Sequence, residues 1–481
     1  MNNNNQSIHI KKEVLVKIIK AFFSENFAKN VELIPFEMRP KGMNVPYRCC
    51  IYKERAILRT RIIAGLGFSI ENDDEIKQLS VYAEEALARE TPASGPLTVI
   101  DAACKGCTPH RIHVTDLCQG CVARPCQSVC KFGAISMSNG RSVIDGAKCK
   151  NCKMCIAQCP YNAIVKIIVP CEDACPVDAI VKDTNGFVQI DYDACLSCGK
   201  CIMNCPFGAV HEKSQIIDIL KQMQSGGRVI ALIAPSIVGQ FPGGVYRLKT
   251  AMQKAGFADV YEVAQGADTT TRNEAREFAE RMEAGAPFMT TSCCAGYSQF
   301  INKHLPEIRE FVSATKTPLY YIAEKVRRDE PSALTVFISP CVAKKNEGRA
   351  NPNIDFVMNY EELGALLIAR NIEILDCEEA VFDTESSKQG RNFGVSGGVA
   401  GAVASISQGD VRPCVINGLD KTTIKLLKKM AKDRKCEEGN LVEVMCCENG
   451  CIGGNATICP PKTAQRALAQ FCAGSSDLKR L

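Results

Sequence analysis

Three features that would point to other classes of protein are absent from this sequence of 481 residues. The formal net charge is only +5, which gives no reason to expect binding to nucleic acid. The longest apolar run, near residues 229–241, is short and is broken by Pro235, so it does not predict a membrane span. The polar start, Met-Asn-Asn-Asn-Asn-Gln, lacks the charged and apolar regions of an export signal. We therefore expect a cytoplasmic protein of about two to four domains that binds neither nucleic acid nor membrane.

Cysteine, in contrast, is abundant. The chain has 29 cysteines, many of them in CxxC-type groups. Without an export signal, such groups favour metal ligation in a reducing cytoplasm over disulfide formation.

Three segments in the C-terminal half place cysteines where one metal cluster could bind. Residues 443–455 contain Cys447 and Cys451, spaced so that one helical turn would direct both sulfurs to one object. Residues 291–297 and 339–347 each follow an apolar, strand-like run. Since Cys293 and Cys294 are neighbours, we expect one to be a ligand and the other a free thiol. The four thiolates Cys294, Cys341, Cys447 and Cys451 suit a 4Fe-4S cluster, and four inert thiols beside glycine turns are the alternative.

These segments resemble the three signature motifs of the catalytic domain of FeFe-hydrogenases, over roughly residues 225–460. The resemblance implies an H-cluster, which is a 4Fe-4S cubane joined through one cysteine to a diiron unit with CO, cyanide and a bridging dithiolate. It also implies that the four cysteines hold the cubane and that Cys451 bridges to the diiron unit.

The resemblance further implies a proton path that runs through Arg281, Glu277, Ser313, Glu274 and Cys293. A free thiol suits the last position because its ordinary pKa, about 8.5, lies near working pH. A solvated ion-pair face would give the same helical spacing of the two glutamates and the arginine.

Contacts to the diiron unit are implied for Ser236 and Lys344, which would face cyanide, and for Met445, which would pack against the unit. Outside such a site these residues would be a helix cap, a surface lysine and core filling. The chain departs from prototype sequences at Ala295, Tyr297, Ser339 and Asn455, where prototypes have Pro, Trp, Met and a third glycine. It therefore resembles a divergent, second-group FeFe-hydrogenase.

A six-residue motif that begins with cysteine and ends in Ala-Ile or Ala-Val occurs four times. The four copies begin at Cys130, Cys159, Cys175 and Cys205. In bacterial ferredoxins, which these segments resemble, such a cysteine ligates the other cluster of a two-cluster module, so four copies imply two modules. The first module would use Cys118, Cys121 and Cys126 with Cys159, and Cys149, Cys152 and Cys155 with Cys130.

We interpret the second module as one split by insertion of the first. Its clusters would be held by Cys104, Cys107, Cys171 and Cys205, and by Cys195, Cys198, Cys201 and Cys175. Loss of one split-site cluster, or ligation by His110 or His113, is the main alternative, and a structural use of the clusters without electron transfer is another.

The remaining segments predict the fold. Residues 10–27 and 73–89 have apolar side chains at helical spacing. The basic residues 48–61, with Cys49 and Cys50, form either a solvated face beside small buried thiols or a docking surface for an acidic electron carrier. A predicted buried strand at 227–236 precedes further predicted elements, which indicates α/β structure. These are helices at 245–255 and 274–283 and strands at 258–263, 335–339, 356–358 and 414–417.

The sequence thus predicts a mostly helical region (1–97), a nested double ferredoxin-like α+β domain with four 4Fe-4S clusters (98–213), and a two-lobed α/β H-cluster domain of sheets flanked by helices (214–481). The predicted activity is 2H⁺ + 2e⁻ ⇌ H₂. A ferredoxin-type carrier would exchange the electrons, and maturation proteins would supply the diiron unit. A hydrogen-sensing or regulatory protein and a non-catalytic iron-sulfur assembly or carrier protein are the alternatives, and the joint presence of the relay residues favours catalysis.

Overall fold

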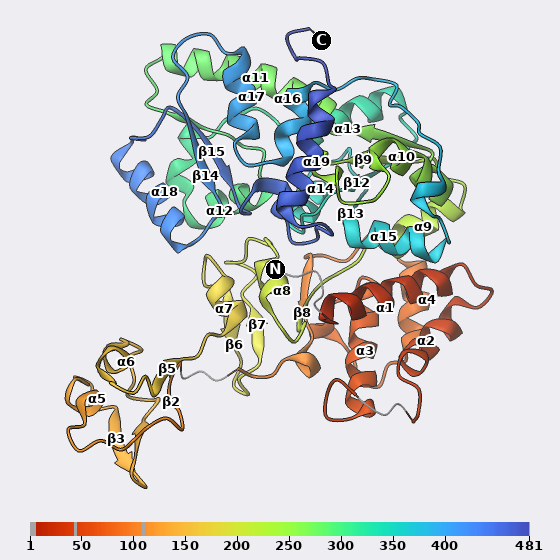
Figure 1. Cartoon of the computed structure of the whole chain (residues 1–481). Coiled ribbons are helices and arrows are strands. Elements are labelled where there is room, and N and C mark those ends of the chain that lie inside the picture. Colours follow the sequence, from red (N-terminus) through yellow and green to blue (C-terminus); the bar gives the residue numbers. More distant parts are fainter. Residues whose placement is uncertain (1–5, 43–45, 108–110, 481) are drawn as a thin grey trace.

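The computed structural model describes residues 6–42, 46–107 and 111–480, and it contains a helical N-terminal region, a cysteine-rich region and a larger α/β region (Figure 1). The helices described in the N-terminal region are α1 (Gln6–Phe22), α2 (Phe27–Met38), α3 (Ile51–Gly65) and α4 (Leu79–Ala88). Within the described residues, no helix combines the length and the apolar character that a membrane crossing requires.

Two helix predictions in this region are corrected. Residues 10–27 do not form one helix, because α1 ends at Phe22 and the Asn26 side chain caps α2 by accepting a hydrogen bond from the Lys29 N–H. Residues 73–78 are not helical either. Asp73 forms an ion pair with Arg59 and accepts a 2.7 Å hydrogen bond from the Tyr82 hydroxyl, so α4 begins only at Leu79.

The cysteine-rich region is closed by the antiparallel pair β1 (Leu97–Val99) and β8 (Val210–Glu212). Inside it, β6 (Ile180–Lys182) pairs with β7 (Val188–Ile190), and α7 (Pro170–Ala174) packs on α8 (Lys200–Asn204). A second unit starts and ends at the pair β2 (Ile112–Val114) and β5 (Ile164–Lys166), and it projects away from the rest of the chain (Figure 1). Its other elements are α5 (Pro125–Ser128), β3 (Ile135–Ser138), β4 (Arg141–Ile144) and α6 (Met154–Gln158).

Two parallel sheets organise the α/β region. One has the order β10-β9-β12-β13, formed by Asp259–Glu262, Val229–Ile233, Leu334–Ile338 and Phe356–Met358. The other has the order β11-β15-β14, formed by Met289–Thr290, Leu441–Met445 and Pro413–Asn417. All residues of β9 and β15 are buried, as expected for parallel strands covered on both faces.

Helices cover both sheets, which confirms the predicted α/β class. They are α9 (Ile216–Gln224), α10 (Gly244–Ala255), α11 (Ala264–Glu283), α12 (Ala295–His304), α13 (Pro318–Asp329), α14 (Lys344–Ala350), α15 (Tyr360–Ala369), α16 (Lys388–Arg391), α17 (Gly398–Ile406), α18 (Lys421–Asp433) and α19 (Pro461–Ala473).

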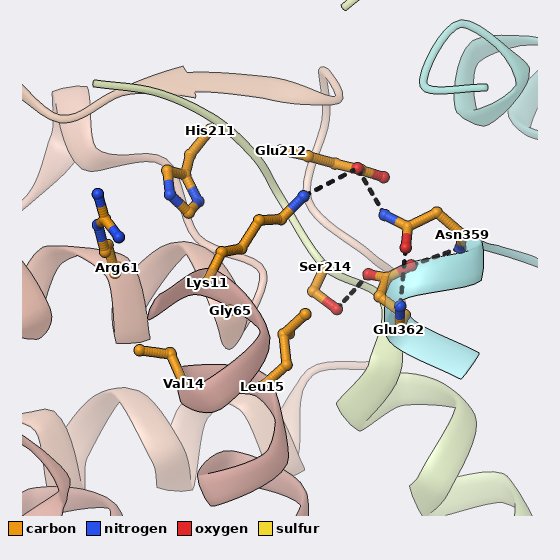
Figure 2. A pocket seen from close by; sticks show the side chains of 10 residues that line it. All are labelled: Lys11, Val14, Leu15, Arg61, Gly65, His211, Glu212, Ser214, Asn359 and Glu362. Carbon is orange, nitrogen blue, oxygen red and sulfur yellow. Dashed lines mark hydrogen bonds and ion pairs between the residues drawn. The ribbon is translucent and has the colours of Figure 1, made fainter. Parts of the chain in front are cut away.

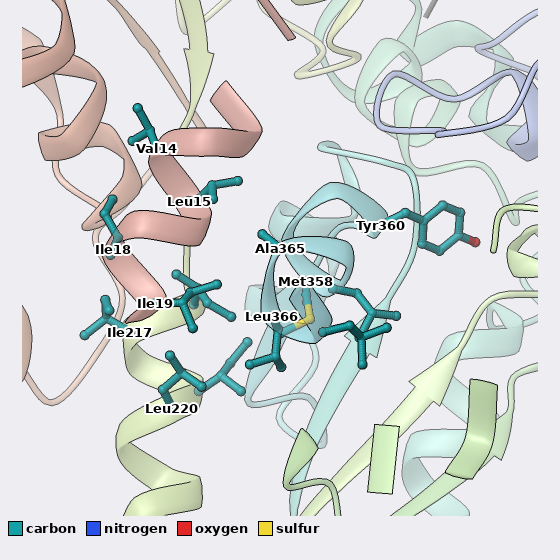
Figure 3. Packing of buried hydrophobic residues seen from close by; sticks show 14 of the residues in the cluster. Val14, Leu15, Ile18, Ile19, Ile217, Leu220, Met358, Tyr360, Ala365 and Leu366 are labelled. Carbon is teal, nitrogen blue, oxygen red and sulfur yellow. The ribbon is translucent and has the colours of Figure 1, made fainter. Parts of the chain in front are cut away.

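The N-terminal helices dock on the α/β region through α1 and α15. Leu15 and Ile19 of α1 are buried in one apolar cluster with Ile217 and Leu220 of α9 and Leu366 of α15 (Figure 3). Since these contacts are buried and apolar, we attribute most of the cohesion between the two regions to the hydrophobic effect.

Beside this apolar contact lies a buried network of charges drawn from all three regions. Lys11 Nζ lies 2.7 Å from Glu361 Oε2, and the Asn359 amide donates to Glu212 Oε2 over 2.7 Å. Ser214 donates to Glu362, and Lys345 pairs with Glu212. Figure 2 shows Lys11, Glu212, Ser214, Asn359 and Glu362 converging between α1, β8 and α15. Each buried charge therefore has a partner, which burial requires.

Candidate active site and cluster-binding cysteines

The cysteines of the three C-terminal segments lie just beyond the carboxyl ends of parallel strands. Cys294 caps α12 shortly after β11, Cys341 follows β12, and Cys447 and Cys451 follow β15. Since β12 belongs to one sheet and β11 and β15 to the other, the site draws its residues from both sheets. This is the edge at which open α/β sheets build their sites.

Two details of local geometry correct the sequence-based picture. Cys447 and Cys451 are not joined by one helical turn, because Asn449 and Gly450 take positive φ values of 68° and 75° and a short 3-10 helix spans Gly450–Gly453. The spacing of three residues between Cys341 and Lys344 predicts that both lie on one helical face, but α14 begins only at Lys344.

The four thiols nevertheless lie near one another. Burial raises the pKa of Cys341 to about 12, and the nearby Cys294 and Cys451 contribute to the same shift. Burial followed by the proximity of Cys341 and Cys294 raises the pKa of Cys447 well above its usual value. The Cys446 N–H donates to Cys294 Sγ over 3.4 Å, which fixes β15 against the start of α12.

This donor set fits a cubane. Among the residues that the structure describes, no three His, Cys, Asp or Glu side chains are close enough to ligate a single metal ion. A cubane instead takes one thiolate at each of its irons, so that its ligands stand apart around a shared centre. The buried hydroxyls of Thr291, Ser339 and Ser396 have no hydrogen-bond partner in the described structure. They supply polar groups in or beside the three segments for further ligand contacts.

Lys344 has a protein partner that the sequence did not identify. Its Nζ lies 2.5 Å from Glu347 Oε2 and donates to the Cys293 carbonyl over 3.2 Å. Burial lowers the pKa of Lys344, but the Glu347 carboxylate outweighs burial and the net pKa is raised. Lys344 is therefore a charged ammonium held beside the cysteine segments.

The outer part of the predicted proton path is continuous in hydrogen bonds. Arg281 Nη2 lies 2.7 Å from Glu277 Oε1, and the Ser313 hydroxyl donates to Glu277 Oε2 over 2.8 Å. The N–H groups of Ala314 and Thr315 donate to the same carboxylate at 2.8 and 3.1 Å. Burial raises the pKa of Glu277, but these donors and Arg281 lower it overall. Glu277 is thus an anion that connects the surface to Ser313.

Glu274 has the opposite character. It is 0% exposed, and neither carboxyl oxygen has a hydrogen-bond partner within standard distance among the described residues. Burial raises the pKa of Glu274 to about 8, although Ser313 and the Ser292 N–H lie near enough to oppose the shift. Burial also raises the pKa of Cys293 well above its usual value, and the nearby Glu274 carboxyl adds to this effect. Both groups are therefore neutral at pH 7.

Ser236 and Met445 also lie beside the cysteines. The Ser236 hydroxyl shares a 2.8 Å hydrogen bond with Tyr360, whose pKa is raised by burial and further by Cys451 and Cys341. Met445 is buried in an apolar cluster against which Cys293 and Cys294 pack. Sequence reasoning missed Tyr360, because it carries no motif and reaches the site only through the fold.

Glu443 is a further residue whose role the sequence did not show. It is 0% exposed and accepts hydrogen bonds of 2.8 Å from the N–H groups of Gly397 and Ala400, at the start of α17. Its position within a cysteine-rich motif was the available signal. The carboxylate holds the start of α17 against β15.

Several accessory cysteines lie near other members of the ligand sets that the sequence predicts. Besides burial, the groups that raise the pKa of Cys155 are Cys149, Cys152 and Cys130. Cys104 and Cys205 likewise raise the pKa of Cys107, and Cys205 and Cys107 raise the pKa of Cys171. The pKa of Cys195 is raised by Cys198 and Cys175. Cys201 is affected by Cys198, Cys195 and Cys175.

The remaining predicted set is Cys118, Cys121, Cys126 and Cys159. Ser142 contacts the sulfurs of Cys118 and Cys126 at 3.4 and 3.5 Å, and Cys159 packs in the same apolar cluster as Cys126. His113 lies in β2, opposite Val165, and His110 lies outside the described residues.

One accessory group touches the site itself. The Cys446 thiol lies close enough to Cys198 to lower the pKa of Cys198 to about 7. The Ser197 hydroxyl accepts a 3.0 Å hydrogen bond from the Asn346 amide of α14, and the Lys200 ammonium contacts the Leu419 carbonyl over 2.5 Å. The loop 195–201 is therefore docked on the α/β region beside the four converging thiols.

Comparisons with known proteins relate parts of the chain to described families. Residues 227–455 match the family described as "Iron only hydrogenase large subunit, C-terminal domain", and residues 166–216 match an LdpA Fe-S cluster-binding domain. The chain is 27% identical over 315 residues to the periplasmic Fe hydrogenase large subunit of Nitratidesulfovibrio vulgaris. This alignment covers 52% of this chain and 73% of the relative. It is 27% identical over 308 residues to iron hydrogenase 1 of Clostridium pasteurianum, and this alignment covers 51% of this chain and 53% of the relative. A solved structure of an FeFe-hydrogenase HydA1 variant from Chlamydomonas reinhardtii is 18% identical, covers 56% of this chain and 92% of that chain, and gives a TM-score of 0.45.

The α/β region therefore contains the C-terminal domain that is typical of the large subunit in FeFe-hydrogenases, and an iron-sulfur cluster-binding region precedes it. The chain spans only about half the length of the Clostridium pasteurianum relative, at 53%.

Proposed function

We propose that the protein is an FeFe-hydrogenase that catalyses 2H⁺ + 2e⁻ ⇌ H₂ at an H-cluster. The observation that carries this proposal is the order of proton-binding groups behind the cysteines. A partly exposed ion pair, Arg281 and Glu277, is hydrogen-bonded to Ser313, and Ser313 lies beside the neutral buried carboxyl of Glu274. A protein that only carried or assembled iron-sulfur clusters would have no need for such a path into a dry site.

The proton can be followed through these atoms. Glu277 takes a proton at its carboxylate from solvent near Arg281, and the Ser313 hydroxyl passes it inward. Glu274 holds it on a carboxyl whose pKa, about 8, is close to working pH, so both loading and release are accessible. The Cys293 thiol is the last carrier on the proposed path. A thiol in that place adds no permanent buried charge.

Cys294, Cys341, Cys447 and Cys451 would hold the cubane, and Cys451 would bridge to the diiron unit. Ser236, Lys344 and Met445 would line the space for that unit: the hydroxyl and the ammonium can donate hydrogen bonds, and the thioether supplies an apolar contact. When bound, the H-cluster supplies the metal centre at which protons and electrons combine.

Electrons would pass along the accessory clusters between the site and a ferredoxin-type carrier. The contact of Cys198 with Cys446 supports the cluster of Cys195, Cys198, Cys201 and Cys175 as the one nearest the site. Cys201 also lies near Cys171, a predicted ligand of the next cluster. Maturation proteins would deliver the diiron unit.

The test is hydrogen production by anaerobically matured protein with a reduced dye as electron donor. We expect turnover, and we expect Glu274→Gln, which keeps size but cannot ionise, to lower it by about 100-fold or more. The exposed Glu283, on the same helix, gives the matched control Glu283→Gln, which should leave turnover unchanged. Loaded protein without turnover, or with equal turnover in the Glu274 variant, would contradict the proposal.

A further inference from the structure

A groove beside Cys104 stands out among the surfaces that the catalytic site does not use. It opens between α1, residues 47–61 and the loops at Cys104 and Phe207. Its charged lining is one-sided: the cations are Arg39, Arg48, Lys53, Arg61 and Lys105, and the carboxylate is Glu54. Glu54 is already engaged by Arg39. The groove is therefore strongly positive.

Neutral partners hold two of these cations, so their charge is not cancelled. Arg48 donates to the Phe207 and Ala103 carbonyls at 2.9 and 3.4 Å. Arg61 donates to the Gly208 carbonyl over 3.4 Å, and its buried Nε has no partner in the described structure. Burial and the nearby Arg48 lower the pKa of Arg61 to about 10, as expected where cations crowd together. An anionic partner would relieve this repulsion.

Exposed aromatic side chains lie in the groove lining and next to lining residues in the sequence: Tyr47 lines the groove, and Tyr52 precedes the lining residue Lys53. Tyr47 and Tyr52 are 60% and 70% exposed, and Phe36, at 50%, is stacked on the Arg55 guanidinium 4.8 Å away. Exposed aromatic and arginine side chains are enriched where proteins bind one another. Cys49 is exposed and Cys50 is half-buried, which corrects the interpretation of this segment as small buried thiols.

Cys104 forms part of the groove wall. It is also a predicted ligand of the cluster shared by Cys107, Cys171 and Cys205, the last two of which are buried. A protein seated in the groove would therefore touch a cluster ligand directly, without the projecting unit at residues 112–166 lying between them.

We propose that this groove is the docking site of an acidic electron-carrier protein, which exchanges single electrons with the cluster at Cys104. In the direction of hydrogen production the carrier is oxidised by one electron and the cluster is reduced by one, and no bond forms or breaks. The role of the docking in electron transfer rests on the proposed function, but binding of the carrier can be measured without turnover.

The experiment reverses charge at two exposed lysines, Lys53→Glu with Lys105→Glu, in the full chain. The control pair Lys425→Glu with Lys428→Glu makes the same charge change on the exposed face of α18, which is also basic. Binding of an acidic 2[4Fe-4S] ferredoxin is measured at low ionic strength by calorimetry. Ferredoxin-linked and methyl viologen-linked hydrogen production are measured in parallel, and the viologen rate is the reference for folded enzyme.

We expect the groove pair, Lys53→Glu with Lys105→Glu, to weaken ferredoxin binding about tenfold or more and to raise the KM for ferredoxin by a similar factor. The control pair should bind ferredoxin as the parent protein does. The affinity of the parent should fall steeply with salt, because the attraction is between charges. Equal binding by the parent and the groove pair, or loss of binding confined to the α18 pair, would overturn the proposal. If no variant makes hydrogen while the groove pair alone loses binding, the docking site stands and the proposed function fails.

Discussion

Asn455 lies directly against Gly199, so closely that a Cβ built on Gly199 would come within 2.6 Å of Asn455 Cγ. The Asn455 Oδ1 also accepts a 3.2 Å hydrogen bond from the N–H of Val342, the residue after Cys341. One amide therefore touches the loop of an accessory cysteine, Cys198, and the loop of a predicted cubane ligand.

The first prediction concerns this contact. Gly199→Ala should separate the loop 195–201 from the α/β region, because the new methyl group collides with Asn455. We expect slower electron transfer between the accessory clusters and the active site, measured by rapid-freeze electron paramagnetic resonance after flash reduction.

Gly186→Ala is the matched control for this prediction. Both glycines have positive φ, 75° and 83°, but a Cβ on Gly186 meets nothing within 4 Å. The two variants share a backbone cost of about 1–2 kcal/mol, and only Gly199→Ala adds the collision. Equal electron-transfer rates in the two variants would show that the contact does not set the spacing.

A second prediction follows from the closeness of the Cys446 thiol to Cys198. Cys446→Ala removes a thiol close to the sulfur of a predicted cluster ligand, and hydrogen-bond donors to cluster sulfurs favour the reduced, more negative cluster. The reduction potential of one accessory cluster should therefore shift to more negative values in a redox titration followed by electron paramagnetic resonance. Cys414→Ala, at a buried thiol outside every predicted ligand set, is the control and should leave all potentials in place.

A third prediction uses the ionisation of Glu274. The pKa of this carboxyl is raised from 4.5 to about 8, so the folded chain keeps a proton that the unfolded chain loses. Its contribution to stability therefore falls as pH rises from 4.5 toward about 8 and is constant above that. Infrared difference spectra should show a carboxyl C=O band that titrates near pH 8 and is missing in Glu274→Gln. A band that titrates below pH 6, or one that survives the substitution, would refute the assignment.

The fourth prediction concerns the buried charges between the three regions. Burial raises the pKa of Glu212, but Lys345 and Lys11 outweigh burial and lower it. Lys345→Met would leave the Glu212 and Glu362 carboxylates together in the interior, at a cost of about 3–5 kcal/mol in the free energy of unfolding.

Urea unfolding followed by circular dichroism measures this loss. Lys254→Met, at an exposed lysine of α10, should change the free energy of unfolding little. Adding Glu212→Gln to Lys345→Met should restore part of the loss, since it removes one of the two like charges. If Lys345→Met leaves the free energy of unfolding unchanged, then solvation by water, and not Lys345, stabilises the two carboxylates.

Part of this arrangement was accessible from the sequence. The four converging cysteines could be predicted because each lies in a short motif just after a strand, and the carboxyl ends of parallel strands share an edge. The accessory sets stay a prediction, drawn from a repeat whose spacing carries the ligand pattern of ferredoxins. In both cases the information is local, within a few residues of each cysteine.

The rest depended on contacts that no local pattern encodes. Ser236 and Tyr360 are 124 residues apart and meet only because their elements are placed side by side. The loop at Cys447 was predicted as a helical turn, although the pair Asn449-Gly450, which favours positive φ, was a signal against it. The exposure of Cys49 depends on how α3 sits on the cysteine-rich region, which residues 48–61 alone do not reveal.

The most direct test of the account is infrared spectroscopy of the protein after anaerobic maturation, with Cys451→Ser as the comparison. The account predicts CO and cyanide stretching bands in the parent protein and their loss in the variant, since Cys451 would bridge the cubane to the diiron unit. A matured protein with its iron-sulfur clusters in place but with no CO or cyanide bands would contradict it.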